Sequence, residues 1–299
     1  MQYEITMDLC RDYSELVQSW MRQQEIQSEK TGEDLWYEFF NLQKKKIKPQ
    51  KRKVWFSNEF SCPADFQNGL KILVHKFEIG DDVSLNLSKD AHCASEFDAL
   101  LYDWGIYHFH LGETIDRKTG RITRTGPVLF AKVDDRNVYC INVYFHGKGV
   151  ASPWSKQGMV KILHNNWPET IKKYKLLEGI QLYPTSLELP TDQEYSLLRN
   201  SGITTPIFVD KGIAYFSPGG GYMSTGHSYE VVSICQKIHN TLKLNEIYIK
   251  ENITSLVKNI ERVAGELPEC QLHLKLLEQN GEYCVVDLHS MVKLVPIKF

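Results

Sequence analysis

Several features that would identify a class of protein at once are absent from this chain of 299 residues. No apolar run reaches the length of about 18 residues that a transmembrane helix requires, so we expect no membrane span. The first residues lack a basic region followed by an apolar stretch, and we therefore expect no signal peptide. The formal net charge is only −2, which gives no overall attraction to nucleic acid or anionic lipid. These absences favour a cytoplasmic protein.

The cysteines are scattered and form no CxxC pair. There are seven of them, and an odd number does not predict a disulfide framework. We expect reduced thiols and no cysteine-based zinc site. A Walker A sequence is also missing, as is a GxGxxG fingerprint after a suitable strand, so the sequence predicts no bound cofactor.

The most informative stretch that is present covers residues 102–112, which contains His108 and His110. Its pattern is typical of a β-strand, in which alternate side chains point to opposite faces. Both imidazoles should therefore lie on the same side. The other side carries three large apolar side chains: Tyr107, Phe109 and Leu111.

Two more strands are predicted at 127–133 and 138–146, separated by a turn at 134–137. In the last of these strands, alternation predicts one apolar face made of Tyr139, Ile141, Val143 and Phe145. If all the apolar faces turn toward the core, the opposite face of the sheet collects His108, His110, Lys132, Asn142, Tyr144 and His146. A slip of one residue would bury these polar groups, so the register should be strongly specified.

This set of side chains suits the cleavage of a phosphodiester in RNA. One histidine can remove the proton of a ribose 2′-hydroxyl, while a second acid protonates the leaving oxygen. We assign the catalytic roles to His108, His110, His146, Lys132 and Tyr144. Contacts to the nucleic-acid backbone are expected from Arg121, Arg124, Lys51, Arg52 and Lys53. The basic run 44–53 that contains the last three is also typical of a solvated linker.

Residues 106–146 resemble the meander of the RelE/ParE and barnase-like superfamily of bacterial toxin nucleases. The likeness lies in helices followed by antiparallel strands with basic, Tyr and His residues on one face. It implies a metal-independent endoribonuclease, with His108, His110, Lys132 and His146 as site residues, and a neutralising or regulatory protein as a partner. It also suggests a role in antiviral defence. The chain is much longer than such toxins, and histidines replace their usual strand arginines.

Other interpretations stay open. The histidines are also compatible with an ordinary structural role in the sheet. His108, His110 and His146 would suit a metal-dependent nuclease. The His-Phe-His segment resembles the HUH nucleases as well, for which Tyr174 would be the nucleophile. A non-enzymatic interaction or sensor protein of a defence system is the remaining alternative. The glycine-rich segment 218–227 predicts a loop before a helix, where backbone amides could bind phosphate.

The order of predicted elements favours an α+β protein. Its centre is a helix-supported antiparallel β-meander, followed by a second α/β portion of unknown role. We place a helical N-terminal segment with the basic run at 1–60, the sheet domain with the histidines at 61–176, and the second portion at 177–299. The sequence does not indicate whether the protein is a monomer or an oligomer.

Overall fold

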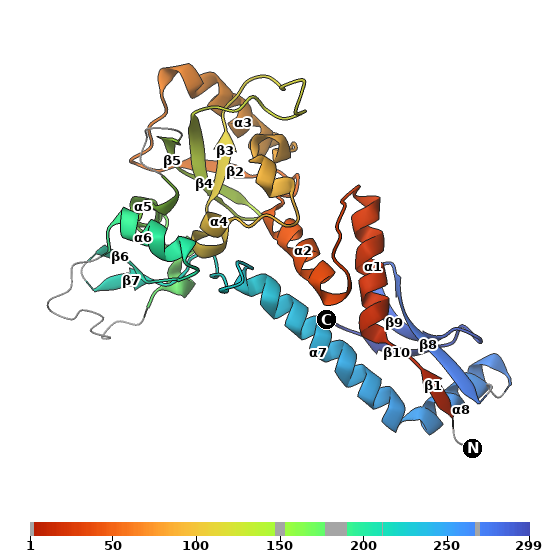
Figure 1. Cartoon of the computed structure of the whole chain (residues 1–299). Helices are drawn as coiled ribbons and strands as arrows, with labels where there is room; N and C mark the ends of the chain where they lie inside the picture. Colours follow the sequence, from red (N-terminus) through yellow and green to blue (C-terminus); the bar gives the residue numbers. More distant parts are fainter. Residues whose placement is uncertain (1–2, 147–152, 177–189, 211, 267–269) are drawn as a thin grey trace. The chain divides into compact units, whose positions relative to one another are not determined.

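The computed structural model describes residues 3–146, 153–176, 190–210, 212–266 and 270–299 (Figure 1). Helices and mostly antiparallel strands occur together in these residues, which confirms the α+β class. The chain divides into two compact units. The larger unit consists of residues 41–230, and the smaller unit combines residues 1–40 with residues 231–299.

The larger unit is built around a four-stranded sheet in the order β2-β5-β4-β3. The strands are β2 (Lys53–Phe56), β3 (Tyr107–His110), β4 (Pro127–Val133) and β5 (Asn137–Phe145). The last three form the predicted antiparallel meander. The short strand β2 adds to it in parallel, through pairing with the first half of β5.

Further elements cover both faces of this sheet. They are α3 (Gln67–Ile79), α4 (Ala99–Trp104), α5 (Gly158–Asn166), α6 (Asp192–Asn200), β6 (Ile207–Asp210) and β7 (Ile213–Tyr215). On one face, Leu73 and Phe77 of α3 pack with Phe109. On the other face, α4, α5 and the hairpin β6-β7 pack around Phe130. The expectation of one core face and one open polar face is therefore wrong, because the sheet lies between two apolar clusters.

A β-bulge in β5 changes which side chains share a face. Asn142 pairs with Phe130, whereas the next pair along the strands is Ala131 with Cys140, so Ile141 is an extra residue. As a result Ile141 joins the cluster around Phe130, and Val143 joins the cluster beneath α3. The uniform apolar face predicted for this strand does not exist.

The smaller unit joins the two ends of the described chain in one sheet, ordered β1-β8-β9-β10. Its elements are β1 (Glu4–Thr6), α1 (Leu9–Gln23), α2 (Gly32–Lys45), α7 (Tyr229–Glu251), α8 (Ile253–Ala264), β8 (Gln271–Gln279), β9 (Glu282–Asp287) and β10 (Lys293–Ile297). The strand β1 pairs in parallel with β8. The boundaries between the units fall within α2, after residue 40, and near the start of α7, after residue 230.

This division differs from the three segments expected at 1–60, 61–176 and 177–299. Residues 1–40 belong with the C-terminal sheet, and residues 190–230 belong with the histidine sheet. The reason is that pairing between distant segments, such as β1 with β8, leaves no mark on the local pattern of either segment.

The helix α1 shows how local sequence and distant contacts combine in the smaller unit. Asp8 caps its N-terminus by accepting a hydrogen bond from the backbone N–H of Arg11. Its buried face carries Asp12, whose carboxylate accepts a hydrogen bond from the backbone N–H of Leu276 in β8. The helix is thus attached to the sheet by a polar contact as well as by apolar packing. No helix in the described part of the chain is long and apolar enough to cross a membrane.

Candidate functional site

The three histidines singled out from the sequence lie together at one end of the sheet in the larger unit. His108 and His110 point from β3 to the same side, and His146 follows directly after β5. The ring centroids of His110 and His146 are 5.9 Å apart. The indole of Trp154 lies 4.7 Å from the ring of His108 and 5.5 Å from that of His146. This aromatic ring therefore packs against two of the three imidazoles.

The histidines line a pocket of about 440 Å³. Its wall also contains two arginines and two aspartates: Arg124, Arg199, Asp90 and Asp98. The Asp98 carboxylate caps α4 by accepting a hydrogen bond from the backbone N–H of Leu101. A second hollow of about 360 Å³ shares His110 and Arg124 with the first. The wall thus combines imidazoles with charged groups of both signs.

Burial keeps the three imidazoles neutral at pH 7. Desolvation is the largest cause that lowers the pKa of His108, and the negative charge of Asp98 only partly opposes it. The same effect lowers the pKa of His110 to about 4, with Arg124 as the next cause. It also lowers the pKa of His146, where Arg124 again acts in the same direction. Neutral imidazoles can accept a proton or donate a single hydrogen bond.

The hydrogen bonds of the imidazoles differ in a way that matters for chemistry. Nδ1 of His110 accepts a hydrogen bond from the backbone N–H of Thr125 at 3.2 Å, which assigns the proton to Nε2. In contrast, Nδ1 of His108 and Nε2 of His146 are buried and have no hydrogen-bond partner among the described residues. Unpartnered buried polar atoms are uncommon in folded proteins and often mark functional sites. His108 and His146 are therefore the residues best placed to act on a ligand.

A buried ion pair supports one wall of the pocket. The guanidinium of Arg199 donates to the Asp103 carboxylate at 2.9 Å and also to the carbonyl oxygen of Trp154. It lies over the ring of Trp104 as well, 4.2 Å from the centroid. Burial raises the pKa of the Asp103 carboxyl, and the charge of Arg199 and a hydrogen bond from Ser217 act against this. Arg199 consequently holds the backbone that carries Trp154.

A buried lysine holds another segment of the pocket wall. The ammonium of Lys45, at the end of α2, donates to the carbonyl oxygens of Asp90, Cys93 and Glu96 at 2.5 to 3.0 Å. Burial lowers the pKa of this lysine. These bonds fix the segment that contains Asp90 and leads into Asp98. The pocket wall is thereby attached to a helix rather than left as an open loop.

Two predicted catalytic residues lie outside this wall. Lys132 is on the same face of the sheet as His108, but its ammonium lies 3.5 Å from the carbonyl oxygen of Pro218. Burial lowers its pKa to about 8. Tyr144 packs against Phe130, with ring centroids 5.6 Å apart. Neither side chain is among the residues that line the pocket.

The predicted backbone-binding residues separate into two groups. Arg121 and Arg124 both line the second hollow, next to His110. The other three belong to β2 and the segment before it, where Lys51 and Lys53 are exposed. Arg52 is buried and donates hydrogen bonds to the carbonyl oxygens of Asp134, Lys48 and Gln50. It therefore stabilises a turn and does not present its charge to a ligand.

The glycine-rich segment 218–227 uses its first amides within the fold. The N–H of Gly219 donates to the carbonyl oxygen of Asp103, and the N–H of Gly221 donates to that of Tyr102. A Cβ atom at Gly219 would lie 2.4 Å from the nitrogen of Gly105, so only glycine allows this approach. Because these amides are already bonded, the expectation that they bind phosphate is not supported.

The metal alternative for the histidines is not supported by the distances in the pocket. Among the described residues, the one group of His, Cys, Asp or Glu that brings three potential ligand atoms within 4.8 Å of one another is Cys10, Glu33 and His239, in the smaller unit. The three pocket imidazoles do not form such a group. Tyr174, the nucleophile of the HUH interpretation, packs against the apolar cluster around Phe130 and does not line the pocket.

Sequence reasoning did not identify Trp154, Arg199 or Asp98 as parts of the pocket. Arg199 lies in α6 and gives no local signal, because its role depends on a partner from α4. Trp154 lies beyond the end of the last strand predicted for the meander, at residue 146, so strand alternation does not indicate where its side chain points. The N-cap position of Asp98 before α4 was the one available local signal, and it predicts a helix start, not a pocket.

No protein-family model matches this chain, and no curated protein or solved structure matches it. The resemblance to toxin nucleases therefore stays a prediction.

Proposed function

We propose that the histidine pocket binds a phosphodiester of single-stranded RNA and cleaves it without a metal ion. The observation that carries this proposal is the pair of unpartnered ring nitrogens, Nδ1 of His108 and Nε2 of His146, in one pocket. The exposed Arg124 in the same wall would contact the phosphate. Arg199 is assigned to holding Trp154, since its guanidinium already bonds to protein oxygens.

The proposed reaction transfers two protons, one from the attacking hydroxyl and one to the leaving oxygen. One of the pair His108 and His146 removes the proton of the ribose 2′-hydroxyl as its oxygen forms a bond to phosphorus. The other imidazole donates a proton to the 5′-oxygen as the bond from that oxygen to phosphorus breaks. The products are a 2′,3′-cyclic phosphate and a free 5′-hydroxyl. Arg124 would stabilise the charge that builds on the phosphoryl oxygens.

The lowered pKa values suit the base more directly than the acid. A neutral imidazole is ready to accept a proton, but the acid must carry one before the reaction. A bound phosphodiester supplies a negative charge that favours the protonated imidazole, and His146 is the less buried of the two. Binding of the substrate would therefore prepare the acid.

The second hollow supports a polymeric substrate rather than a small phosphate ester. It shares His110 and Arg124 with the pocket and is also lined by Lys89 and Arg121. A chain that enters the pocket with one phosphate could place its next phosphate near these cations. We assign the roles of Arg121 and Arg124 on this basis. Lys132 and Tyr144 are not included, because they do not line the pocket.

The test is cleavage of labelled single-stranded RNA and DNA with and without EDTA. We expect RNA cleavage that resists EDTA and falls by at least about 100-fold in His108→Ala and in His146→Ala. The matched control is His75→Ala, which changes an exposed histidine of α3 and should cleave RNA like the wild type. Cleavage that EDTA abolishes, or that both pocket variants retain, would contradict the proposal.

A non-enzymatic protein that binds an anion, as a sensor or regulator, is the second candidate. The observation in its favour is that burial lowers the pKa of all three pocket histidines. At pH 7, before a ligand binds, they are therefore neutral and do not carry the proton that a general acid must donate. This candidate predicts that RNA binds to the pocket and that Arg124→Ala weakens binding, while no product forms. Fluorescence anisotropy of the labelled RNA, combined with product analysis, separates the two.

A further inference from the structure

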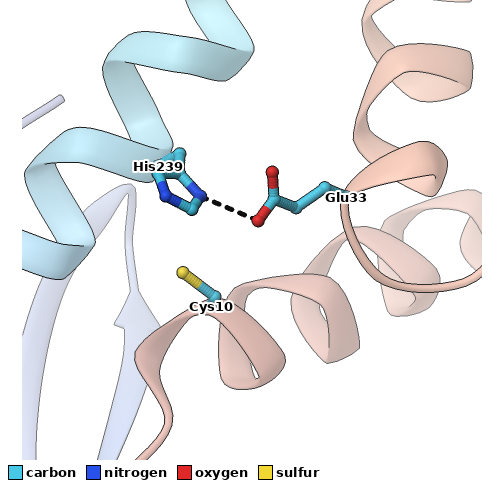
Figure 2. A group of neighbouring side chains, drawn as sticks. All are labelled: Cys10, Glu33 and His239. Atoms are coloured by element: carbon cyan, nitrogen blue, oxygen red, sulfur yellow. Dashed lines mark hydrogen bonds and ion pairs between the residues drawn. The ribbon is translucent and has the colours of Figure 1, made fainter.

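Three side chains with metal-binding atoms meet in the smaller unit (Figure 2). Cys10 comes from α1, Glu33 from the first turn of α2 and His239 from α7. One potential ligand atom of each lies within 4.8 Å of the other two. Nδ1 of His239 is 2.7 Å from Oε1 of Glu33, and Figure 2 shows the thiol of Cys10 below both groups.

An ion pair alone explains only two of these three groups. The side chains of His239 and Glu33 are 31% and 45% exposed, and pairs of this kind contribute little to stability. A thiol adds nothing to such a pair. A thiol, an imidazole and a carboxylate are, however, three of the ligand types that zinc prefers. The combination therefore indicates a cation site more directly than an ion pair.

The spacing is close to that of a zinc centre. Zinc bonds of roughly 2.0 to 2.3 Å at tetrahedral angles place ligand atoms about 3.3 to 3.7 Å apart. The ligand atoms in this cluster are up to 4.8 Å apart. Side-chain rotations that move these atoms by about 1 Å would bring the most distant ones to the spacing of a zinc centre. Nδ1 of His239 and Oε1 of Glu33, at 2.7 Å, would instead have to move apart by about 0.6 Å to bind the same ion.

We propose that Cys10, Glu33 and His239 bind a zinc ion, with water in the fourth position. Binding releases the thiol proton of Cys10 to solvent, and His239 coordinates through Nδ1 as a neutral imidazole that keeps its ring proton on Nε2. The soft thiolate favours zinc over magnesium or calcium, which bind oxygen ligands. The nearby ammonium of Lys243 does not oppose the ion strongly, because Glu246 pairs with it at 3.1 Å.

The site links the two consecutive helices α1 and α2 to α7, which is far from them in the sequence. Two of its ligands come from the N-terminal part of the smaller unit, and the third comes from the C-terminal part. Zinc that binds the folded unit more tightly than the unfolded chain stabilises it in proportion to the logarithm of the free zinc concentration. The inference is independent of RNA cleavage, since it concerns residues outside the histidine pocket.

Cobalt absorption on the full chain tests the site directly. After removal of metal by chelator, Co²⁺ alone should produce a thiolate-to-cobalt charge-transfer band that saturates at one equivalent and is displaced by Zn²⁺. Cys10→Ser should abolish this band, and His239→Gln should weaken binding at least tenfold. Cys270→Ser, which changes an exposed thiol of the same unit, is the matched control and should keep the band. Absence of the band in the wild type, or its survival in Cys10→Ser, would overturn the proposal.

Thermal unfolding separates loss of metal binding from loss of fold. Without metal, Cys10→Ser and the wild type should unfold at the same temperature, and zinc should raise the midpoint of the wild type only. If Cys10→Ser fails to fold, His239→Gln and Glu33→Gln take its place, because both positions are partly exposed. An equal effect of zinc on the wild type and on these variants would also contradict the site.

Discussion

Two histidine-containing sites, one in each compact unit, offer opposite kinds of contact to a ligand. In the larger unit, His108 and His146 each keep a buried, unpartnered ring nitrogen and have Arg124 as a neighbour. In the smaller unit, His239 is partly exposed and faces a carboxylate and a thiol. The first arrangement suits an anion, and the second suits a cation.

The difference shows that the neighbours of a histidine decide its role more than the histidine itself. Desolvation and Arg124 both lower the pKa of His110 and His146, which leaves them neutral and ready to bind or exchange a proton. The carboxylate of Glu33 instead holds the imidazole of His239 at 2.7 Å. Perturbing these neighbours should therefore affect the two sites unequally.

The largest expected effect comes from the ion pair between Asp103 and Arg199. Asp103→Ala should lower the free energy of unfolding of the larger unit by about 3 to 5 kcal/mol, because it leaves a buried guanidinium without its partner. The matched change in the smaller unit, Glu33→Gln, should cost less than about 1 kcal/mol, since that pair is partly exposed. Urea unfolding measures both. Similar losses in the two variants would remove this contrast between the sites.

A smaller effect is expected from acid. The pKa of His110 is lowered to about 4 in the folded chain, so the unfolded chain binds its proton first as the pH falls. The contribution of neutral His110 to the free energy of unfolding is therefore fully present above the unfolded pKa of about 6.5. It is lost as the pH falls toward 4, by about 3 kcal/mol at most. His110→Gln should flatten the dependence of the unfolding free energy on pH. His75→Gln, at an exposed position, should leave it unchanged. The same slope in both variants would show that His110 is not the cause.

The smallest effect is a change in titration when phosphate is added. A bound anion should raise the pKa of His108 and His146, because it favours the charged imidazole. At fixed pH, phosphate should leave the Cε1 chemical shift of His239 unchanged, since the neighbour of this imidazole is a carboxylate. NMR titration of the histidine Cε1 protons measures all three groups in one sample. A shift at His239 with none in the pocket would reverse the assignment of anion and cation sites.

Strand alternation was enough to predict that His108 and His110 share a side, and the order of strands predicted the meander that brings His146 beside them. The bulge at Ile141 was not predictable, because an extra residue in an apolar strand looks like any other apolar residue. Arg199 and Asp103 were missed for a different reason. Each is an ordinary helix residue until the fold brings the two together. Cys10, Glu33 and His239 meet in the same way, although the scattered cysteines predicted no zinc site.

Lys45 has a consequence for the cost of binding. Its single ammonium bonds to three carbonyl oxygens, much as a small cation would, and so immobilises a segment that ends in the pocket wall. The conformational entropy of that segment is lost when the chain folds, not when a ligand arrives. A pocket prepared in this way binds a ligand without first having to order its own wall. Neutralising the charge of Lys45 would return that cost to the binding step.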